Sequence, residues 1–373
     1  MPGPRCCEYS SVVTRRICYV HAGPHKTGST SIQWFLQENR AELLERGYFV
    51  PESETKRGAH YALVEKLCGL ELGEHREPLV ARSIRALVET PAETVVISSE
   101  ALEGLLASRK HANEFFRRIG ELKLEPKLIL FPRHQPQWIN SSYASSVKSF
   151  RRSDSFQSCA LGFAQSPGAR FSRWLELADA HAAELIAQPF TKETVARGVI
   201  PEFLRSIGIN SSELRDVEIR RNEAVGPFTV GVARDVLRSL GETGESLTWL
   251  QARRCKVTLA AYLGERGLAD AGYCGLTTAL ARHIEAKLQP DNDAFAQRVW
   301  GKPWADVFAG DAGEDFTSND VEMCQPGWFT QRRLRRAVHG MTAALHEILR
   351  DPALAVEAPW NDWRQRSGLI SRE

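Results

Sequence analysis

The amino-acid sequence of 373 residues predicts an α/β fold, in which helices cover a central parallel sheet and an α-helical C-terminal extension follows. Three observations predict it. Short apolar runs occur without alternating polar residues, and such runs indicate strands buried on both faces of a parallel sheet. Helical patterns lie between these runs, as in βαβ units. After about Ile209 the pattern becomes mainly helical.

Four apolar runs are the predicted strands, at residues 17–20, 95–97, 127–131 and 184–187. A Gly/Pro/Ser/Thr turn follows the first strand and leads into a helical segment that ends at about residue 46, before Gly47. In that segment the apolar residues recur at helical spacing and are expected to face a core; they are Ile32, Phe35, Leu36 and Leu43. Further helices are predicted at residues 102–119 and 136–148, the second with Pro136 in its first turn.

The second half of the chain contains predicted helices at residues 225–240, 247–263, 277–288 and 341–349. Two segments rich in Ser, Gly, Asp and Gln, 150–172 and 309–327, are interpreted as long loops, which often form lids or binding loops. We therefore divide the chain into a flexible N-terminal tail (1–14) and a single domain (15–373). That domain comprises an α/β core (15–230), a mainly helical extension (231–350) and a C-terminal tail (351–373).

Composition narrows the class of protein. Apolar residues make up 43% and charged residues 25% of the chain, as in packed globular proteins. The net charge of +2 is too balanced to indicate a nucleic-acid partner. The eight cysteines are scattered without a C-x-x-C pair, so we expect no metal motif and mostly reduced core cysteines. No secretory leader or run of about 18 apolar residues occurs, and we expect a cytoplasmic protein without a transmembrane segment.

The strongest local pattern is the segment from His21 to Thr30, HAGPHKTGST, between the first predicted strand and the first predicted helix. Free backbone N–H groups at a helix N-terminus bind anions, and Lys26 adds a positive charge beside them. The segment therefore predicts a phosphate cradle. It differs from the P-loop pattern G-x-x-x-x-G-K-[ST], because Ser29 stands where the lysine would follow the second glycine.

A second pattern follows the strand predicted at 127–131. Arg133 comes two residues after that strand, and Ser141 lies eight residues later on the predicted following helix, with Ser142 beside it as a competing choice. An arginine offers a planar, charged donor fork that suits phosphate, and a serine two turns along a helix adds a hydroxyl.

Together these patterns resemble the PAPS-dependent sulfotransferases of the bacterial, P-loop-like sulfotransferase fold. The resemblance is carried by the donor-loop residues His25, Lys26, Thr27, Gly28, Ser29 and Thr30, by Arg133 with Ser141, and by Ser98-Ser99-Glu100 after the second strand. It implies a P-loop-type three-layer α/β/α fold. It also implies that the loop holds the 5′-phosphosulfate and that Arg133 and Ser141 hold the 3′-phosphate of PAPS.

The implied reaction is transfer of a sulfuryl group from PAPS to a hydroxyl or amine of a small-molecule or glycan acceptor, leaving 3′-phosphoadenosine 5′-phosphate without need of a metal. Lys26 would meet charge on the leaving group. A third family signature, an R-K-G-x-x-G loop on the 3′-phosphate, is absent, and Arg221 or its neighbour Arg220 is the substitute we consider.

The attacking group needs a base, and two candidates stand out. Glu100 follows the strand predicted at 95–97, at the sheet edge where α/β folds build their sites. His60 titrates near neutrality, and His21 and His25 lie close to the donor loop. The plain alternatives are a carboxylate that stabilises the next helix for Glu100 and a helix-start residue for His60.

Basic residues after the Ser141 helix, Lys148, Arg151 and Arg152, suit an anionic acceptor, or else a solvated loop. Two other functions stay open. One is a P-loop kinase or other NTPase, which should carry a lysine at position 29. The other is a non-catalytic protein of the same fold that binds a nucleotide or a glycan. The sequence indicates neither the identity of the acceptor nor the oligomeric state.

Overall fold

The computed structural model describes residues 15–210, 214, 225–242, 247–311 and 315–350. Five strands form one sheet in the order β2-β3-β1-β4-β5, and all neighbouring pairs are parallel. The strands are β1 (Arg16–His21), β2 (Tyr48–Phe49), β3 (Thr94–Ser98), β4 (Leu124–Leu130) and β5 (Glu184–Ala187). The prediction of an α/β fold with a central parallel sheet is confirmed, and the four predicted strands are β1, β3, β4 and β5.

The sheet is buried on both faces, which explains its continuous apolar runs. Along β3, Val95 and Ile97 belong to one hydrophobic core while Val96 belongs to another. Along β4, Leu128 and Ile129 divide between the same two cores. Successive side chains of a strand point to opposite faces, so each strand contributes to a helical layer on either side.

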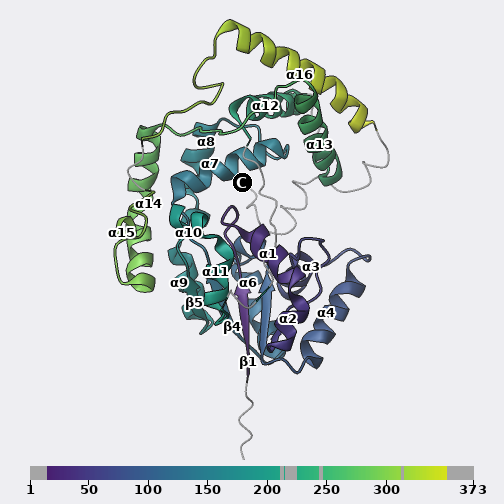
Figure 1. Ribbon diagram of the computed structural model, residues 1–373, viewed down its shortest axis with the longest axis vertical. Coiled ribbons are helices and arrows are strands. Elements are labelled where there is room, and N and C mark those ends of the chain that lie inside the picture. The colour runs from purple at the N-terminus through teal and green to yellow at the C-terminus, as the bar shows by residue number, and fades with distance from the viewer. Residues whose placement is uncertain (1–14, 211–213, 215–224, 243–246, 312–314, 351–373) are drawn as a thin grey trace, which may run out of the picture.

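The helices of the α/β part flank this sheet (Figure 1). They are α1 (Ser29–Glu38), α2 (Arg40–Glu45), α3 (Tyr61–Leu67), α4 (Glu77–Glu89), α5 (Leu102–Leu105), α6 (Arg109–Glu121), α9 (Ser172–Ala180), α10 (Lys192–Arg197) and α11 (Val199–Ser206). The four apolar residues expected to face a core from the first helical segment are all buried. That segment is two helices, because the chain leaves helical geometry at Asn39.

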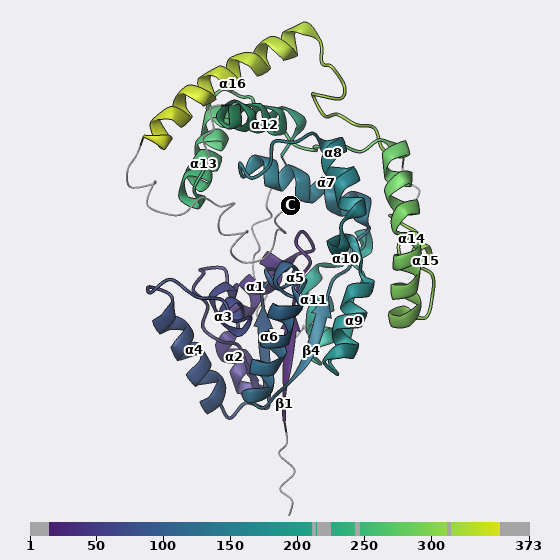
Figure 2. The same ribbon diagram turned by 180° about the vertical axis from the view of Figure 1, so that it is seen from behind.

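A second group of helices lies beyond the carboxyl ends of the strands, as Figures 1 and 2 show from opposite sides. It comprises α7 (Gln135–Lys148), α8 (Phe156–Gln165), the 3-10 turn Pro167–Ala169, α12 (Pro227–Glu242), α13 (Trp249–Glu265), the first part of α14 (Thr278–Trp300) and α16 (Trp328–Leu349). The last part of α14 and α15 (Trp304–Val307) lie beside α9 instead, and Phe295 and Trp304 belong to a core of the sheet. A hydrophobic core of its own holds most of the second group together. This core also includes α7 and α8, which precede β5 in the sequence. The helical part therefore contains residues well before 231, where the sequence placed its start.

Three predicted boundaries are corrected. The segment 150–172, expected as a loop, contains α8, which begins after its N-cap Ser155 and buries Phe156 and Ala160. The helix expected to end at 288 continues through Pro290 to Trp300. The helix expected at 341–349 is the last part of α16, which begins at Trp328.

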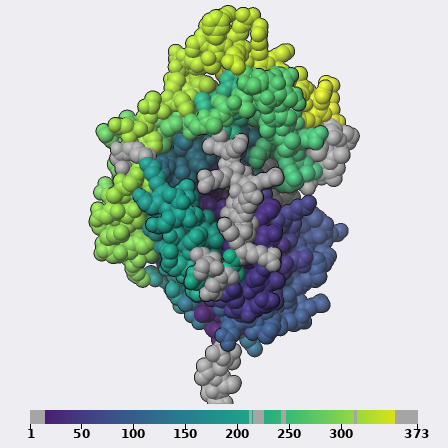
Figure 3. All heavy atoms as spheres, viewed as in Figure 1, coloured from purple at the N-terminus to yellow at the C-terminus, as the bar shows by residue number. Residues whose placement is uncertain are grey.

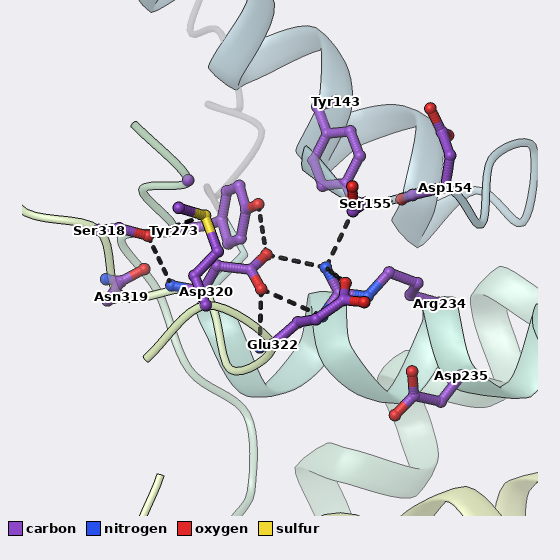
Figure 4. A network of polar contacts seen from close by, with 12 residues as sticks. Tyr143, Asp154, Ser155, Arg234, Asp235, Tyr273, Ser318, Asn319, Asp320 and Glu322 are labelled. Carbon is purple, nitrogen blue, oxygen red and sulfur yellow. Dashed lines mark hydrogen bonds and ion pairs between the residues drawn. The ribbon is translucent and has the colours of Figure 1, made fainter. Parts of the chain in front are cut away.

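A buried polar network ties α7 and α12 to the segment before α16 (Figure 4). The Arg234 guanidinium on α12 donates to both carboxylate oxygens of Asp320, at 2.9 and 3.1 Å, and to the Tyr143 hydroxyl at 3.1 Å. The Tyr273 hydroxyl donates to Asp320 at 2.7 Å. Both ion-pair side chains are 1% exposed. Because buried charges persist only when paired, this network fixes α7 relative to the helical part.

Of the helices that the structure describes, none is both long and apolar enough to cross a membrane. Among the same residues, Cys18, Cys68, Cys159 and Cys255 are buried free thiols, whereas Cys274 is half-buried and Cys324 is exposed.

Candidate functional site

The carboxyl ends of β1, β3 and β4 bring the predicted site segments to one edge of the sheet. His21, the last residue of β1, pairs in register with Ser98 at the end of β3 and with Ile129 of β4. The loop 22–28, the turn after Ser98 and Arg133 therefore emerge side by side. The proximity is close, since a Cβ placed on Gly23 would lie 3.4 Å from the Cβ of Glu100.

The loop between β1 and α1 is held from outside by side chains that bind its carbonyl groups. Trp138 Nε1 donates to the His25 carbonyl at 2.7 Å, and an Arg133 Nη1 donates to the Lys26 carbonyl at 2.9 Å. Within the loop, the buried Thr27 hydroxyl donates to the Pro24 carbonyl at 2.6 Å. These three carbonyl groups are bonded to donors, whereas the backbone N–H groups of Ser29 and Thr30 stay available for a ligand.

Gly28 begins α1 in a left-handed conformation, with φ of 84°. The turn needs a glycine, because a Cβ there would also meet Val199 Cγ1 at 2.7 Å. No side chain of the described residues caps the first turn of α1, whose amides begin at Ser29 and Thr30. Uncapped amides and the helix dipole are the features that bind anions at helix N-termini, so anion binding at this end stays a prediction.

Lys26 stands beside that helix end among other cations. Its backbone has φ of 66°, a left-handed value that is uncommon outside glycine. Burial lowers the pKa of Lys26 to about 8, and the charges of Lys148, Lys256, Arg133 and Arg151 act in the same direction. So much positive charge in one place favours an anion.

Glu100 faces this loop and is held by two donors. Its Oε2 accepts from Gln33 Nε2 at 2.5 Å, and its Oε1 accepts from the Tyr61 hydroxyl at 2.5 Å. Burial acts to raise the pKa of Glu100, but the charge of His25 and these hydrogen bonds outweigh it, and the net shift is downward. Glu100 is therefore an ionised carboxylate near neutral pH, and its remaining lone pairs are still able to accept a proton.

His60 has a different environment from the one a base requires. It is fully buried; its Nδ1 accepts from the Ser98 amide at 3.0 Å and its Nε2 lies 3.0 Å from the Pro51 carbonyl. Burial lowers its pKa to about 4. The ring connects Pro51 to Ser98 at the end of β3, two residues before Glu100, and its role as a base stays a prediction. His21 is equally buried, and its Nδ1 lies 2.7 Å from the Ser98 hydroxyl.

A cleft of about 1720 Å³ lies at this edge, between the α/β part and the helical part. Figure 3 shows the two parts facing each other on this side of the molecule. The whole lining of the cleft contains six Lys or Arg side chains and two Glu side chains. Among its residues are His25, Lys26, Gly28, Ser29, Thr30, Tyr61, Glu100, Trp138 and Ser141. The loop between β1 and α1, the start of α3, the turn after β3 and the helix α7 therefore meet at one positively charged cleft.

The two residues expected on the 3′-phosphate differ in placement. Ser141 lines the cleft from α7. Arg133 is half-buried against the Phe190 ring, with its guanidinium carbon 5.5 Å from the ring centroid, and supports the loop through the Lys26 carbonyl. It is not among the described residues that line the cleft. Arg220 and Arg221 lie outside the described residues.

Sequence reasoning missed several residues of the site. Gln33 and Tyr61 hold Glu100, and Lys256 reaches the cleft from α13. One signal was available: Ser141 and Ser145 on α7 and Ser149 at its C-cap recur every four residues, and all three line the cleft. That spacing places hydroxyls on one helix face. No group of three or more His, Cys, Asp or Glu side chains that could hold a metal occurs in the described part of the chain.

Comparison of the chain with protein-family models, with curated proteins and with solved structures finds no match.

Proposed function

We propose that this protein transfers a sulfuryl group from PAPS to a hydroxyl or amine of an acceptor, in a P-loop-type site. One observation carries the proposal: an uncapped helix end with Lys26 and an ionised carboxylate, Glu100, face the same cleft from adjacent strand ends. The uncapped N-terminus of α1 and Lys26 suit an anionic leaving group, and the carboxylate suits proton removal from a nucleophile.

The donor loop would hold the 5′-phosphosulfate. The N–H groups of Ser29 and Thr30 and the Lys26 ammonium supply positive charge that is fixed before the donor arrives, which is the most effective form of electrostatic catalysis. Anion binding would also raise the pKa of Lys26 from about 8, because the negative charge favours the ammonium form. Ser141 would contact the donor from α7, and Arg133 would act through the loop it supports.

The transfer step is an in-line displacement at sulfur. The acceptor oxygen or nitrogen forms a bond to sulfur while the bond from sulfur to the bridging phosphate oxygen breaks. The acceptor proton passes to a carboxylate oxygen of Glu100, and the electron pair leaves with 3′-phosphoadenosine 5′-phosphate, whose new charge lies near Lys26. Positioning and charge stabilisation carry the step, as in phosphoryl transfer.

Calorimetric binding of 3′-phosphoadenosine 5′-phosphate, beside ATP with Mg²⁺, tests the donor assignment. The wild type should bind the bisphosphate more tightly than ATP with Mg²⁺. We expect Lys26→Ala to weaken binding of the bisphosphate by about tenfold or more, since hydrogen bonds to charged groups contribute about 1.5–3 kcal/mol. Arg133→Ala should weaken it as well, by loosening the loop.

Arg85→Ala, which removes an exposed cation on α4, is the matched control and should leave binding unchanged. A preference for ATP with Mg²⁺ would replace the proposal with a kinase or NTPase. Binding of the bisphosphate without turnover on any acceptor would favour a non-catalytic nucleotide-binding protein.

A further inference from the structure

A group of cations from three distant segments lines the cleft. Arg57 comes from the segment before α3, Arg151 follows α7, and Lys256 lies on α13. These residues are far apart in the sequence, and the fold brings them to one wall. Figures 1 and 2 both show α13 on the same side of the molecule as α3.

The cations are close enough to affect one another. Burial lowers the pKa of Lys256, and the charges of Lys148, Arg151, Arg57 and Arg253 lower it further. Within the described residues, no carboxylate forms an ion pair with Arg57, Lys148 or Lys256. Like charges this close repel, and a bound anion would lower that cost.

This group lies next to the proposed base. The Tyr61 hydroxyl donates to Glu100, and burial raises the pKa of Tyr61 while the nearby Arg151 charge opposes that rise. Arg57 and Tyr61 line the same cleft on either side of His60 in the sequence. The cations therefore share one cleft with the proposed base Glu100, where an acceptor has to present its nucleophile, and the charges of Arg151 and Lys256 also reach Lys26.

We propose that this arm of the cleft, formed by Arg57, Arg151 and Lys256, binds an acidic saccharide as the sulfuryl acceptor. The proposal rests on the proposed function and names its substrate class. Carboxylate or sulfate groups of the saccharide would meet the three cations while one of its hydroxyl or amino groups reaches Glu100.

Two further features favour a saccharide. Ser145, Ser146 and Ser149 line the cleft from α7, and their hydroxyls can bond sugar hydroxyls. The volume of about 1720 Å³ also exceeds the 300–1,000 Å³ of a usual small-ligand site, so a nucleotide and an extended acceptor fit together.

The test is calorimetric titration, with and without saturating 3′-phosphoadenosine 5′-phosphate, of three hexasaccharides: one with alternating uronic acids, its sulfated counterpart and a neutral one. An acidic oligomer should bind at least about tenfold more tightly than the neutral one. Lys256→Ala and Arg57→Ala should each weaken that binding by about tenfold. Arg57→Ala should leave binding of the bisphosphate as before, and Lys256→Ala should weaken it by less than about threefold, because Lys256 acts on Lys26 only through its charge. The difference should shrink at high salt, which screens these charges.

Arg254→Ala is the matched control, because Arg254 is an exposed cation on α13 that does not line the cleft. Two residues before Lys256, it points about 200° away around the helix. It should leave saccharide binding unchanged.

Three outcomes would overturn the inference: no preference for either acidic oligomer, loss of bisphosphate binding in Lys256→Ala or Arg57→Ala, or tighter competition by a single-stranded oligonucleotide. The second would assign these cations to the donor. The proposed function can fail separately. If the wild type binds no bisphosphate but shows Lys256-dependent binding of an acidic saccharide, the acceptor arm stands and the donor assignment falls.

Discussion

At the scale of single residues, Glu100 shows how neighbours decide what a carboxylate can do. Burial alone would raise its pKa and favour the neutral acid. Gln33 and Tyr61 each donate to one of its oxygens, His25 adds a positive charge, and the pKa falls below its ordinary value. The carboxylate is therefore charged and fixed in direction before a substrate binds.

Glu100→Gln removes the proposed base and keeps the shape of the side chain. We expect sulfuryl transfer to fall by about a hundredfold or more, the usual contribution of a positioned acid or base. The affinity for 3′-phosphoadenosine 5′-phosphate should change by less than about threefold, because Glu100 would contact the acceptor rather than the donor. Steady-state turnover and calorimetry measure the two quantities.

Glu103→Gln is the control, since Glu103 lines the same cleft and its Oε2 accepts from the His25 amide, an interaction that an amide oxygen can replace. Equal losses of turnover in both variants, or an unchanged rate in Glu100→Gln, would contradict a role for Glu100 as the base.

His60 and His21 should make stability depend on pH. The pKa of each is lowered from 6.5 to about 4 by burial. Between these values the unfolded chain binds more protons than the folded one, so stability rises with pH and is lost as pH falls. The loss is on the order of 3 kcal/mol for each group.

His60→Asn should remove roughly half of this loss, because an amide oxygen can accept from the Ser98 amide but does not titrate. Urea unfolding at several pH values between about 7 and 4 measures it. The exposed His75, changed to Asn, should leave the slope as it is in the wild type. A parallel pH profile for His60→Asn would show that His60 does not carry the effect.

At the scale of elements, the turn into α1 depends on one glycine. Gly28→Ala places a Cβ at a φ of 84° and 2.7 Å from Val199 Cγ1. The strained backbone costs about 1–3 kcal/mol, and the shift of the turn would misplace the amides of Ser29 and Thr30. We expect binding of the bisphosphate to fall by about tenfold or more, as measured by calorimetry.

The double variant Gly28→Ala with Val199→Ala separates the two causes. It relieves the contact with Val199 but leaves the positive φ, so binding should recover only in part. Full recovery would show that the contact alone matters, and unchanged binding in Gly28→Ala would contradict the role given to the turn.

Elements with a clear apolar pattern could be predicted from the sequence, and the others could not. β1, β3 and β4 are buried on both faces, and β5 at the sheet edge contacts both cores, so each has a continuous apolar run. β2 has two residues, Tyr48 and Phe49, and is too short to give a pattern. α8 was hidden by its Ser and Gln content, although Phe156, Cys159 and Ala160 fall at helical spacing and are buried.

The site was predictable where residues are near a strand end in the sequence. The loop around Lys26 and the turn at Glu100 meet because parallel strands share a carboxyl edge, and that follows from order alone. Tyr61 and Lys256 reach the cleft only through the packing of α3 and α13. Local patterns hold no information on that packing, so no periodicity in the sequence pointed to them.

At the scale of the whole molecule, two hydrophobic cores flank the sheet and a third organises the helical part. α7 joins them. Its Gln135 side chain exchanges hydrogen bonds with Asn292 of α14, and its Tyr143 reaches the Arg234–Asp320 pair. The wall of the cleft that bears Ser141 is therefore fixed by contacts remote from the chemistry.

Asp320→Asn tests that dependence. It removes the buried counter-charge of the Arg234 guanidinium and leaves only the half-exposed Glu322, and a buried pair that loses one partner costs about 3–5 kcal/mol. Urea unfolding should show a loss of that size. Glu322→Gln is the control: its carboxylate lies 3.3 Å from Arg234 but is 39% exposed, and exposed ion pairs contribute at most about 1 kcal/mol.

The same pair predicts a pH effect with a definite sign. Burial acts to raise the pKa of Asp320, but its hydrogen bond and ion pair with Arg234 outweigh burial and lower it. The stability that Asp320 contributes is thus present above the ordinary aspartate pKa and is lost as pH falls through the lowered value. The difference between wild type and Asp320→Asn should therefore shrink in acid. A constant difference, or equal losses in Asp320→Asn and Glu322→Gln, would mean that the buried pair does not fix the helical part.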